Sequence, residues 1–158
     1  MSKACIFLAD GFEEIEGLTV VDILRRAGVE IHMVSITGET KVTGSHGIEI
    51  KCDTCIGQEN FSEIELFVLP GGMPGTKNLG ACKALKELLT ASFEAGKKLA
   101  AICAAPSVLG DLGILKGKKA CCYPGFEEHL TGAQVVFDQV AQDGNVTTSR
   151  GMGTAIPF

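Results

Sequence analysis

Hydrophobic and polar positions follow two patterns along this chain. Continuous apolar runs of strand length occupy residues 4–9, 64–69 and 98–103. Such runs are typical of strands that are covered on both faces, as in a parallel sheet. Segments with helical spacing lie between them. The alternation of strands and helices predicts an α/β sandwich built around a largely parallel sheet.

Two helices are indicated by apolar residues that recur every three or four positions. The first helix has acidic residues in its first turn, and Arg25 and Arg26 precede Gly28 at its end. These charges match the helix dipole, and the glycine is a typical stop signal. The second helix ends before Gly96. The apolar positions are Ile15, Leu18, Val21 and Leu24 in the first helix and Leu85, Leu88, Leu89 and Phe93 in the second.

Two segments depart from this alternation. Residues 37–50 contain short β-prone pieces separated by glycines, which indicates a small hairpin at a sheet edge. Residues 133–149 place Asp143 and Gly144 between strand-like runs, which predicts a hairpin turn. Because no repeat or linker interrupts the chain, we expect one domain over residues 1–158.

The composition and net charge of the chain exclude some classes of binding partner. The 158 residues are 46% hydrophobic and carry a formal net charge of −5, which gives no basic surface for nucleic acid or anionic lipid. Small molecules or proteins are the expected partners. The first apolar run is too short for a signal sequence or a membrane span, so we expect a cytoplasmic protein. In that compartment the seven cysteines would be thiols.

Four loops are expected to meet at one end of the sheet, because ligands of open α/β sheets bind beyond the carboxyl ends of the strands. These loops read "ADGFEEIE", "PGGMPGT", "CAAP" and "CYPGF". In the third, Cys103 ends a strand and precedes a helix that has Pro106 in its first turn. Backbone N–H groups and the helix dipole would lower the pKa of the thiol there. The alternative is a small buried cysteine with a packing role only.

Two further features could act with Cys103. The segment "LPGG" (69–72) would present backbone N–H groups as oxyanion donors, unless it is an ordinary turn. Glu13 and Glu14 are expected to be solvated in the first helical turn. Glu16 could instead face Cys103, where burial would raise the pKa of its carboxyl group and let it move a proton. A solvated position for Glu16 is the alternative.

Other patterns do not support a cofactor or a metal ion. "GGMPGTK" lacks the order of a phosphate-binding loop, and "GMGTAI" lacks the third glycine of a dinucleotide motif. "CDTC" (52–55) has no second pair of ligands, so we interpret it as chance spacing. His32, His46 and His129 have no metal-ligand spacing, and His129 is expected on the surface.

The motifs "ADGFEEIE", "LPGG", "AAICAAP" and "TSRGMGTA", in this order, resemble the ThiJ/PfpI superfamily and in particular its DJ-one branch. The resemblance covers essentially the whole chain. It implies a flavodoxin-like three-layer sandwich, a homodimer and no cofactor or metal. It also implies that Cys103 is the nucleophile, that Glu16 is a protonated acid bonded to its thiolate, and that Gly72 and Ala104 are backbone N–H donors.

The chain departs from the family pattern in two places. Tyr123 stands where several members have a histidine, so it is a possible neighbour of the site but gives no Cys-His pair. A protease or amidase needs a base, usually histidine, that goes on to protonate the leaving amine. The absence of a Cys-His pair therefore reduces the support for that class of function. Family chains also continue into another helix where this sequence ends, and we expect that helix to be missing.

Two classes of function follow. The first is a glyoxalase-like or deglycase-like enzyme, in which Cys103 attacks a 2-oxoaldehyde such as methylglyoxal, or an early glycation adduct, and Glu16 moves a proton to give a hydroxy acid. The second is a redox-sensing stress protein or chaperone that is switched by oxidation of Cys103 to a sulfinic acid.

Overall fold

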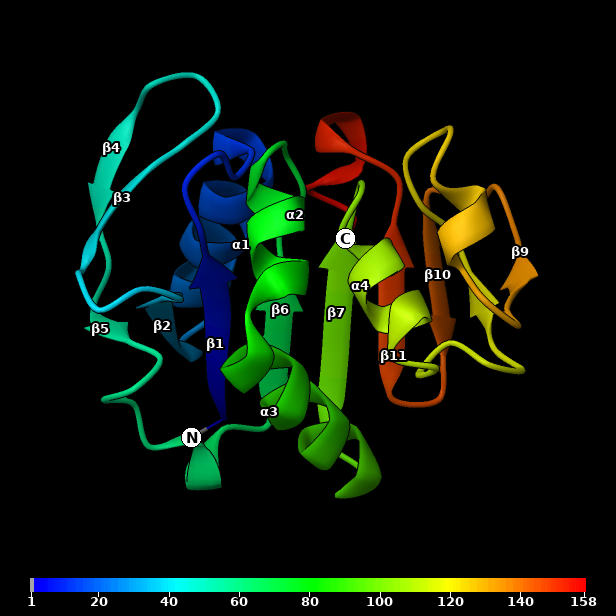
Figure 1. The fold of residues 1–158 in the computed structure, drawn as a ribbon, viewed down its shortest axis with the longest axis horizontal. Helices are drawn as coiled ribbons and strands as arrows, with labels where there is room; N and C mark the ends of the chain where they lie inside the picture. The colour runs from blue at the N-terminus through cyan, green and yellow to red at the C-terminus, as the bar shows by residue number, and fades with distance from the viewer. Residues whose placement is uncertain (1) are drawn as a thin grey trace.

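The computed structural model describes residues 2–158 and has a seven-stranded sheet at its centre, in the order β10-β11-β7-β6-β1-β2-β5 (Figure 1). All neighbouring strands are parallel except β10 and β11. The strands are β1 (Lys3–Leu8), β2 (Glu30–Ser35), β5 (Thr54–Cys55), β6 (Leu66–Leu69), β7 (Lys98–Ile102), β10 (Val140–Asp143) and β11 (Val146–Ser149). The largely parallel sheet expected from the apolar runs is confirmed.

Helices cover both faces of this sheet. Helix α1 (Glu14–Arg26) lies on one face, behind the sheet in Figure 1. Helices α2 (Gly75–Ala81), α3 (Lys83–Glu94) and α4 (Pro106–Asp111) lie on the other face. Short 3₁₀ helices span Phe61–Glu63, Glu127–His129 and Met152–Thr154. This is the three-layer, flavodoxin-like arrangement. Within residues 2–158, no helix is both long enough and apolar enough to cross a membrane.

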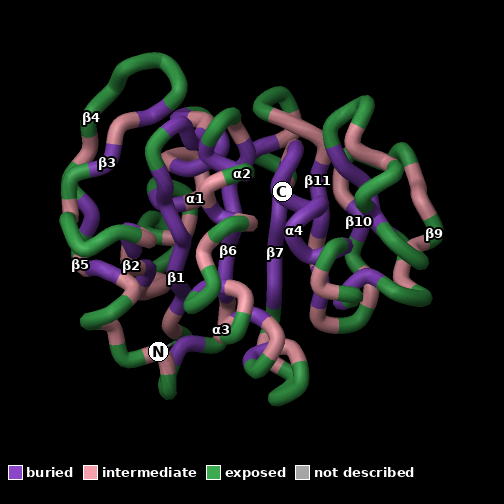
Figure 2. Tube along the Cα trace, in the orientation of Figure 1, coloured by how far each residue is buried: buried purple, intermediate pink, exposed green. Residues whose placement is uncertain are grey.

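The central strand β1 contributes to a hydrophobic core on each face of the sheet. Ile6 and Leu8 belong to the core beneath α1, whereas Cys5 and Phe7 belong to the core beneath the other three helices. All four side chains are fully buried. Figure 2 shows the same burial along the central strands. Because successive residues of a strand point to opposite faces, burial on both faces requires an uninterrupted apolar run.

The two hairpins differ from each other in how they relate to the sheet. Strands β10 and β11 pair across a turn at Gly144, as predicted, and β11 adds to β7 in parallel. Strands β3 (Lys41–Thr43) and β4 (Glu49–Lys51) also form a hairpin, but as a separate two-stranded sheet. The expected small hairpin at a sheet edge is confirmed, because it lies beside the β2–β5 edge of the main sheet without pairing with it (Figure 1). Its Thr43 bonds instead to the loop that follows β1, through the N–H of Gly11 and the side chain of Asp10.

The remaining short strands are β8 (Lys119–Ala120) and β9 (Gln134–Val135), which form a second small sheet. Cys121 and Cys122 directly follow β8 and are both buried. The apolar pattern does not indicate strand β2, because Glu30 and His32 interrupt its apolar positions. The carboxyl ends of β1, β6 and β7 lie at the same end of the sheet (Figure 1), so the loops after them meet there.

A substitution in the sheet tests this description of the core. Phe67 in β6 is fully buried, stacks on Phe7 at a centroid distance of 6.3 Å and lies near Phe61. Phe67→Ala should lower the free energy of unfolding by about 3–5 kcal/mol, because it removes buried apolar surface and leaves a cavity. Phe137, 68% exposed, is the matched control, and Phe137→Ala should cost less than about 1 kcal/mol. Urea unfolding of both variants measures the difference, and equal costs would contradict this packing.

Candidate active site

Cys103 lies directly after β7 in a strained turn that exposes its thiol. Its φ angle is +65°, a left-handed conformation that no other non-glycine residue adopts within residues 2–158. Two hydrogen bonds hold its backbone on either side. The Cys103 N–H donates to Ser149 O at 3.0 Å, and its carbonyl accepts from the N–H of Tyr123 at 2.7 Å. The end of β11 and the loop after β8 therefore fix the direction of the thiol.

Glu16, in the first turn of α1, faces this thiol from the opposite side of the site. Its side chain is buried, and its carboxyl group is hydrogen-bonded to the sulfur of Cys103. Gly71 donates its backbone N–H to Glu16 Oε2 at 2.8 Å and accepts the N–H of Glu13 at 2.9 Å. The loop after β6 thus holds the start of α1 by two bonds, and this contact orients the carboxyl group.

Two further backbone N–H groups point at the sulfur of Cys103. They belong to Gly72, in the loop after β6, and to Ala104, the next residue along the turn. The peptide unit that carries the Ala104 N–H is held in place because its carbonyl, that of Cys103, accepts the N–H of Tyr123 at 2.7 Å. Gly71 contributes no such donor, since its N–H is already bonded to Glu16. The site therefore has two free donors for negative charge at or near the sulfur.

The pKa values of the two acidic groups show how they depend on each other. Burial raises the pKa of the Glu16 carboxyl group to about 7, against the opposing effect of its bonds to Cys103 and Gly71. Burial and the adjacent Glu16 carboxylate raise the pKa of the Cys103 thiol to about 12, and the two N–H donors only partly offset this. Between these values the pair holds one proton.

The expectation of a lowered thiol pKa at Cys103 is therefore wrong. The helix that was expected to stabilise the thiolate begins only at Pro106 and has six residues, and the closest charge to the sulfur is the negative carboxylate of Glu16. A thiolate forms within the pair when the shared proton lies on Glu16. The carboxyl group is then neutral, and its O–H donates to the sulfur.

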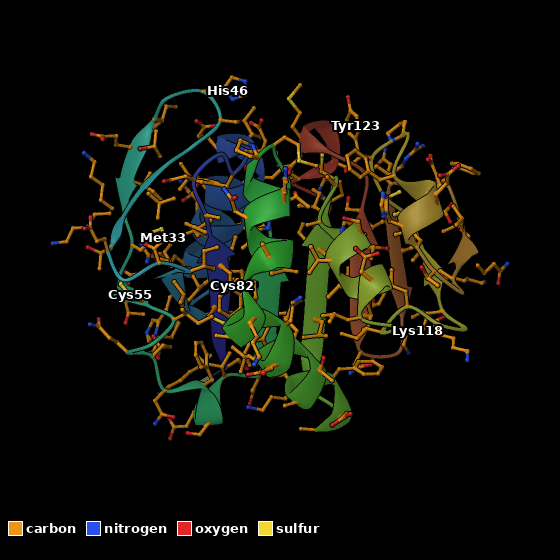
Figure 3. All side chains as sticks on the ribbon, viewed as in Figure 1. Met33, His46, Cys55, Cys82, Lys118 and Tyr123 are labelled. Carbon is orange, nitrogen blue, oxygen red and sulfur yellow. The ribbon has the colours of Figure 1, made fainter. Side chains whose placement is uncertain are left out.

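These groups line a cleft of about 300 Å³. Cys103, Glu16, Gly72 and Ala104 all border it, so the structure brings together the four residues that the sequence singled out. Tyr123 borders it too, at the end of the sheet where Figure 3 shows its side chain. The other lining residues, which the sequence analysis did not identify, are Glu13, Met73, Phe126 and Met152. Three of these four are apolar, and among the described residues no histidine lines the cleft.

Other residues singled out from the sequence lie elsewhere. His129 is exposed at the end of a short 3₁₀ helix, as expected. Cys52 and Cys55 are buried free thiols. The expectation that Glu14 is solvated is wrong, because its side chain is buried beneath the β3–β4 hairpin. Burial opposes ionisation there, but bonds from His46 and Ile48 outweigh it and lower the pKa of Glu14 to about 2.

A glycine substitution tests how closely the loop after β6 approaches the turn at Cys103. A Cβ at Gly71 would lie 2.5 Å from Cys103 Cβ and 2.6 Å from Glu16 Oε2, distances that real Cβ atoms do not show. Gly71→Ala should therefore displace the pair and slow alkylation of Cys103 by iodoacetamide at least tenfold. Gly80→Ala is the control, because its Cβ would come no closer than 3.7 Å to Val108. Peptide mass spectrometry of the alkylated chain measures both rates, and an unchanged rate in Gly71→Ala would contradict the geometry.

The shared proton predicts the pH dependence of thiol reactivity. As pH rises through about 7, the pair changes from two protons to one, and thiolate–acid pairs become available. Alkylation of Cys103 should therefore rise through about pH 7 and then level off. In Glu16→Gln the thiol loses its proton-sharing partner but stays buried. The rise in alkylation rate should therefore move to a pH above 9.0, the ordinary pKa of a cysteine thiol. The rate of Cys103 alkylation from pH 5 to 10 measures this, and identical profiles would refute the coupling.

Comparison with known proteins agrees with the fold. The family model described as the DJ-1/PfpI family matches residues 2–158. The chain is 39% identical to Protein DJ-1 homolog B of Arabidopsis thaliana over 99% of its own length, but it spans only 36% of that protein. It is 33% identical to Deglycase PH1704 of Pyrococcus horikoshii, with 94% of this chain and 89% of the relative covered.

A solved structure has the same fold. The crystal structure of Drosophila melanogaster DJ-1beta superimposes with a TM-score of 0.94 at 38% identity and covers 99% of this chain and 86% of that one. A family match over nearly the whole chain and the shared architecture lead to one conclusion. The chain belongs to the DJ-1/PfpI family.

Proposed function

We propose that this protein is a cysteine-dependent, cofactor-free enzyme that converts 2-oxoaldehydes, such as methylglyoxal, to 2-hydroxy acids. The observation that carries the proposal is the arrangement at the cleft. A partly exposed thiol there shares a proton with a buried carboxyl group and faces two backbone N–H donors. The 33% identity to a protein named a deglycase supports chemistry on carbonyl adducts of this kind.

The first step is attack on the aldehyde carbon. The Cys103 thiolate forms a C–S bond, and the carbonyl π electrons move to oxygen to give a hemithioacetal alkoxide. The N–H groups of Gly72 and Ala104, which face the sulfur, are the donors available to this oxyanion. Glu16 holds the shared proton during attack, so the thiolate forms without a base outside the pair.

The second step moves hydrogen between adjacent carbons. Glu16 first gives its proton to the alkoxide. As a carboxylate it then takes the proton from the former aldehyde carbon and returns it to the neighbouring carbon of the resulting enediolate, while a proton passes from one oxygen to the other. The first carbon is thereby oxidised to a thioester and the second is reduced to a secondary alcohol. Water then cleaves the thioester, which releases the 2-hydroxy acid and restores the thiol. The sum is addition of one water molecule, so no external oxidant or reductant is needed.

A redox-sensing role is the second candidate. Cys103 and Cys82 are partly exposed, whereas the other five cysteines are buried. The two N–H donors that would hold an oxyanion would also stabilise a sulfinate at Cys103. A protease or amidase has less support, because none of the described residues that line the cleft is a histidine, and Tyr123 is among the residues that line it.

Lactate production from methylglyoxal, with chelator present and glutathione absent, tests the enzyme proposal. Cys103→Ala should abolish turnover, because no C–S bond can form. Glu16→Gln should lower kcat by at least about 100-fold, because the proton carrier is lost. Cys82→Ala removes a partly exposed thiol where α2 meets α3 and should retain full activity.

Two outcomes would refute the enzyme proposal. One is lactate formation that persists in Cys103→Ala. The other is a folded wild-type protein that forms no lactate, which together with rapid addition of two oxygen atoms to Cys103 by peroxide would favour the redox sensor.

A further inference from the structure

A second cluster of ligand-type side chains lies beside the cleft, where the loop of the β3–β4 hairpin meets the start of α1. We call it the Glu13–His46 cluster, and its members are Glu13, Glu14, Ser45 and His46. Figure 3 shows His46 on this loop, at the same end of the sheet as Tyr123. Glu13 also lines the cleft, so the cluster adjoins the candidate active site without including Cys103 or Glu16.

Both carboxylates use one oxygen for structural bonds and leave the other directed into the cluster. Glu13 Oε1 accepts the N–H of Ile15 at 3.3 Å, as the cap of α1. Glu14 Oε1 accepts the N–H of His46 at 2.7 Å and is further held near the N–H of Ile48. The Oε2 atoms of Glu13 and Glu14 remain, and both lie close to the ring of His46. Such support orients carboxylate ligands in many metal sites.

Five of the six distances among the four converging atoms are close to those of a tetrahedral coordination shell. His46 Nδ1 lies 3.0 Å from Glu14 Oε2 and 3.5 Å from Glu13 Oε2. Ser45 Oγ lies 3.4 Å from Glu13 Oε2, 3.3 Å from Glu14 Oε2 and 3.1 Å from His46 Nδ1. Ligands bound at the usual zinc distances are about 3.3–3.4 Å apart at the corners of a tetrahedron. These five edges all lie near that length.

The charge of the cluster also favours a cation. Glu14 is 5% exposed, and buried carboxylates are normally paired with a cation or bound to a metal. Within residues 2–158, no lysine or arginine nitrogen lies within 4.0 Å of the carboxylate of Glu13 or Glu14, and His46 is the partner of both. The two carboxylates carry two negative charges, and the imidazole of His46 can offset at most one of them. A divalent ion neutralises both.

A glycine in the hairpin loop permits this arrangement. A Cβ at Gly44 would overlap the carboxyl group of Glu14, so only glycine lets the loop close over that side chain. The loop is then fixed, because the N–H of Ser45 donates to Phe12 O at 2.8 Å. Ser45 and His46 are consequently held above the two carboxylates before any ion binds.

We propose that Glu13 Oε2, Glu14 Oε2 and His46 Nδ1 bind one zinc-type divalent metal ion, with Ser45 Oγ or a water molecule in the fourth position. Imidazole and carboxylate ligands in a tetrahedral arrangement suit Zn²⁺ among the common divalent ions. The bound ion displaces any proton on His46 Nδ1 and neutralises two negative charges at the edge of the cleft. The Cys103 thiol is not one of the proposed ligands.

The chain contains a matched control for this proposal. His32 also contacts two glutamates, but Glu59 meets its Nδ1 at 2.9 Å and Glu30 meets its Nε2 at 3.2 Å. The two carboxylates therefore lie against opposite nitrogens of the ring. They cannot coordinate one metal ion together with a single nitrogen of His32. His32→Ala should leave metal binding unchanged, although it removes a histidine with the same number of acidic neighbours.

Zn²⁺ titration of the chelator-treated chain, in competition with a chromophoric chelator, tests the proposal, with Co²⁺ absorption as a second readout. Wild type, Cys103→Ser and His32→Ala should each bind one ion per chain at the site. His46→Ala and Glu13→Gln should weaken that binding at least tenfold, and circular dichroism should show both to be folded. His46 is exposed and Glu13→Gln keeps an oxygen for the helix cap, so neither change removes core packing. Bound Co²⁺ should show no sulfur-to-metal charge-transfer band.

Three results would overturn the proposal. The first is a wild-type chain that binds no Zn²⁺ at protein-stoichiometric concentrations. The second is binding of equal strength in wild type and His46→Ala. The third is loss of binding in Cys103→Ser together with a sulfur-to-cobalt band in the wild type, which would place the ion on the thiol instead.

Discussion

The hydrogen bond between the Glu16 carboxyl group and the Cys103 sulfur is the contact on which the candidate site depends. It joins α1 to the turn after β7, two segments that are far apart in the sequence. Burial disfavours a charge on either group, so the pair keeps one proton over a wide pH range. That proton decides whether the sulfur is a thiol or a nucleophile. The surrounding N–H groups are arranged about this pair.

The fold makes this contact possible by bringing three loops to one end of a parallel sheet. Strands β1, β6 and β7 are neighbours, so the segments that follow them, which carry Glu16, Gly71 and Cys103, emerge side by side. Gly71 and Gly72 allow the middle loop to pass between α1 and the thiol, where any side chain would collide. The strain in the turn at Cys103 is balanced by hydrogen bonds to Ser149 and Tyr123 on either side.

Much of this arrangement could be predicted from the sequence, because it depends on local patterns. The apolar runs identify the buried strands, and the position of Cys103 after a run identifies the turn. Glu16 could not be selected over Glu13 and Glu14 from the residues alone, since all three belong to one helical turn, and the family resemblance was needed. The burial of Glu14 depends on His46, 32 positions away along the chain, and no local pattern reports such a contact.

The upward shift of the Cys103 pKa cannot be predicted from the local sequence for a similar reason. Proximity to a helix start suggested stabilisation of the thiolate, but the dominant effects are burial and a carboxylate from a distant segment. Infrared difference spectroscopy of the Glu16 carboxyl group across pH, with Glu16→Gln as the blank, tests the central claim most directly. The account predicts a protonated C=O band that disappears with a midpoint near pH 7 and shifts in Cys103→Ala. A band that disappears near pH 4.5, unaffected by Cys103→Ala, would contradict it.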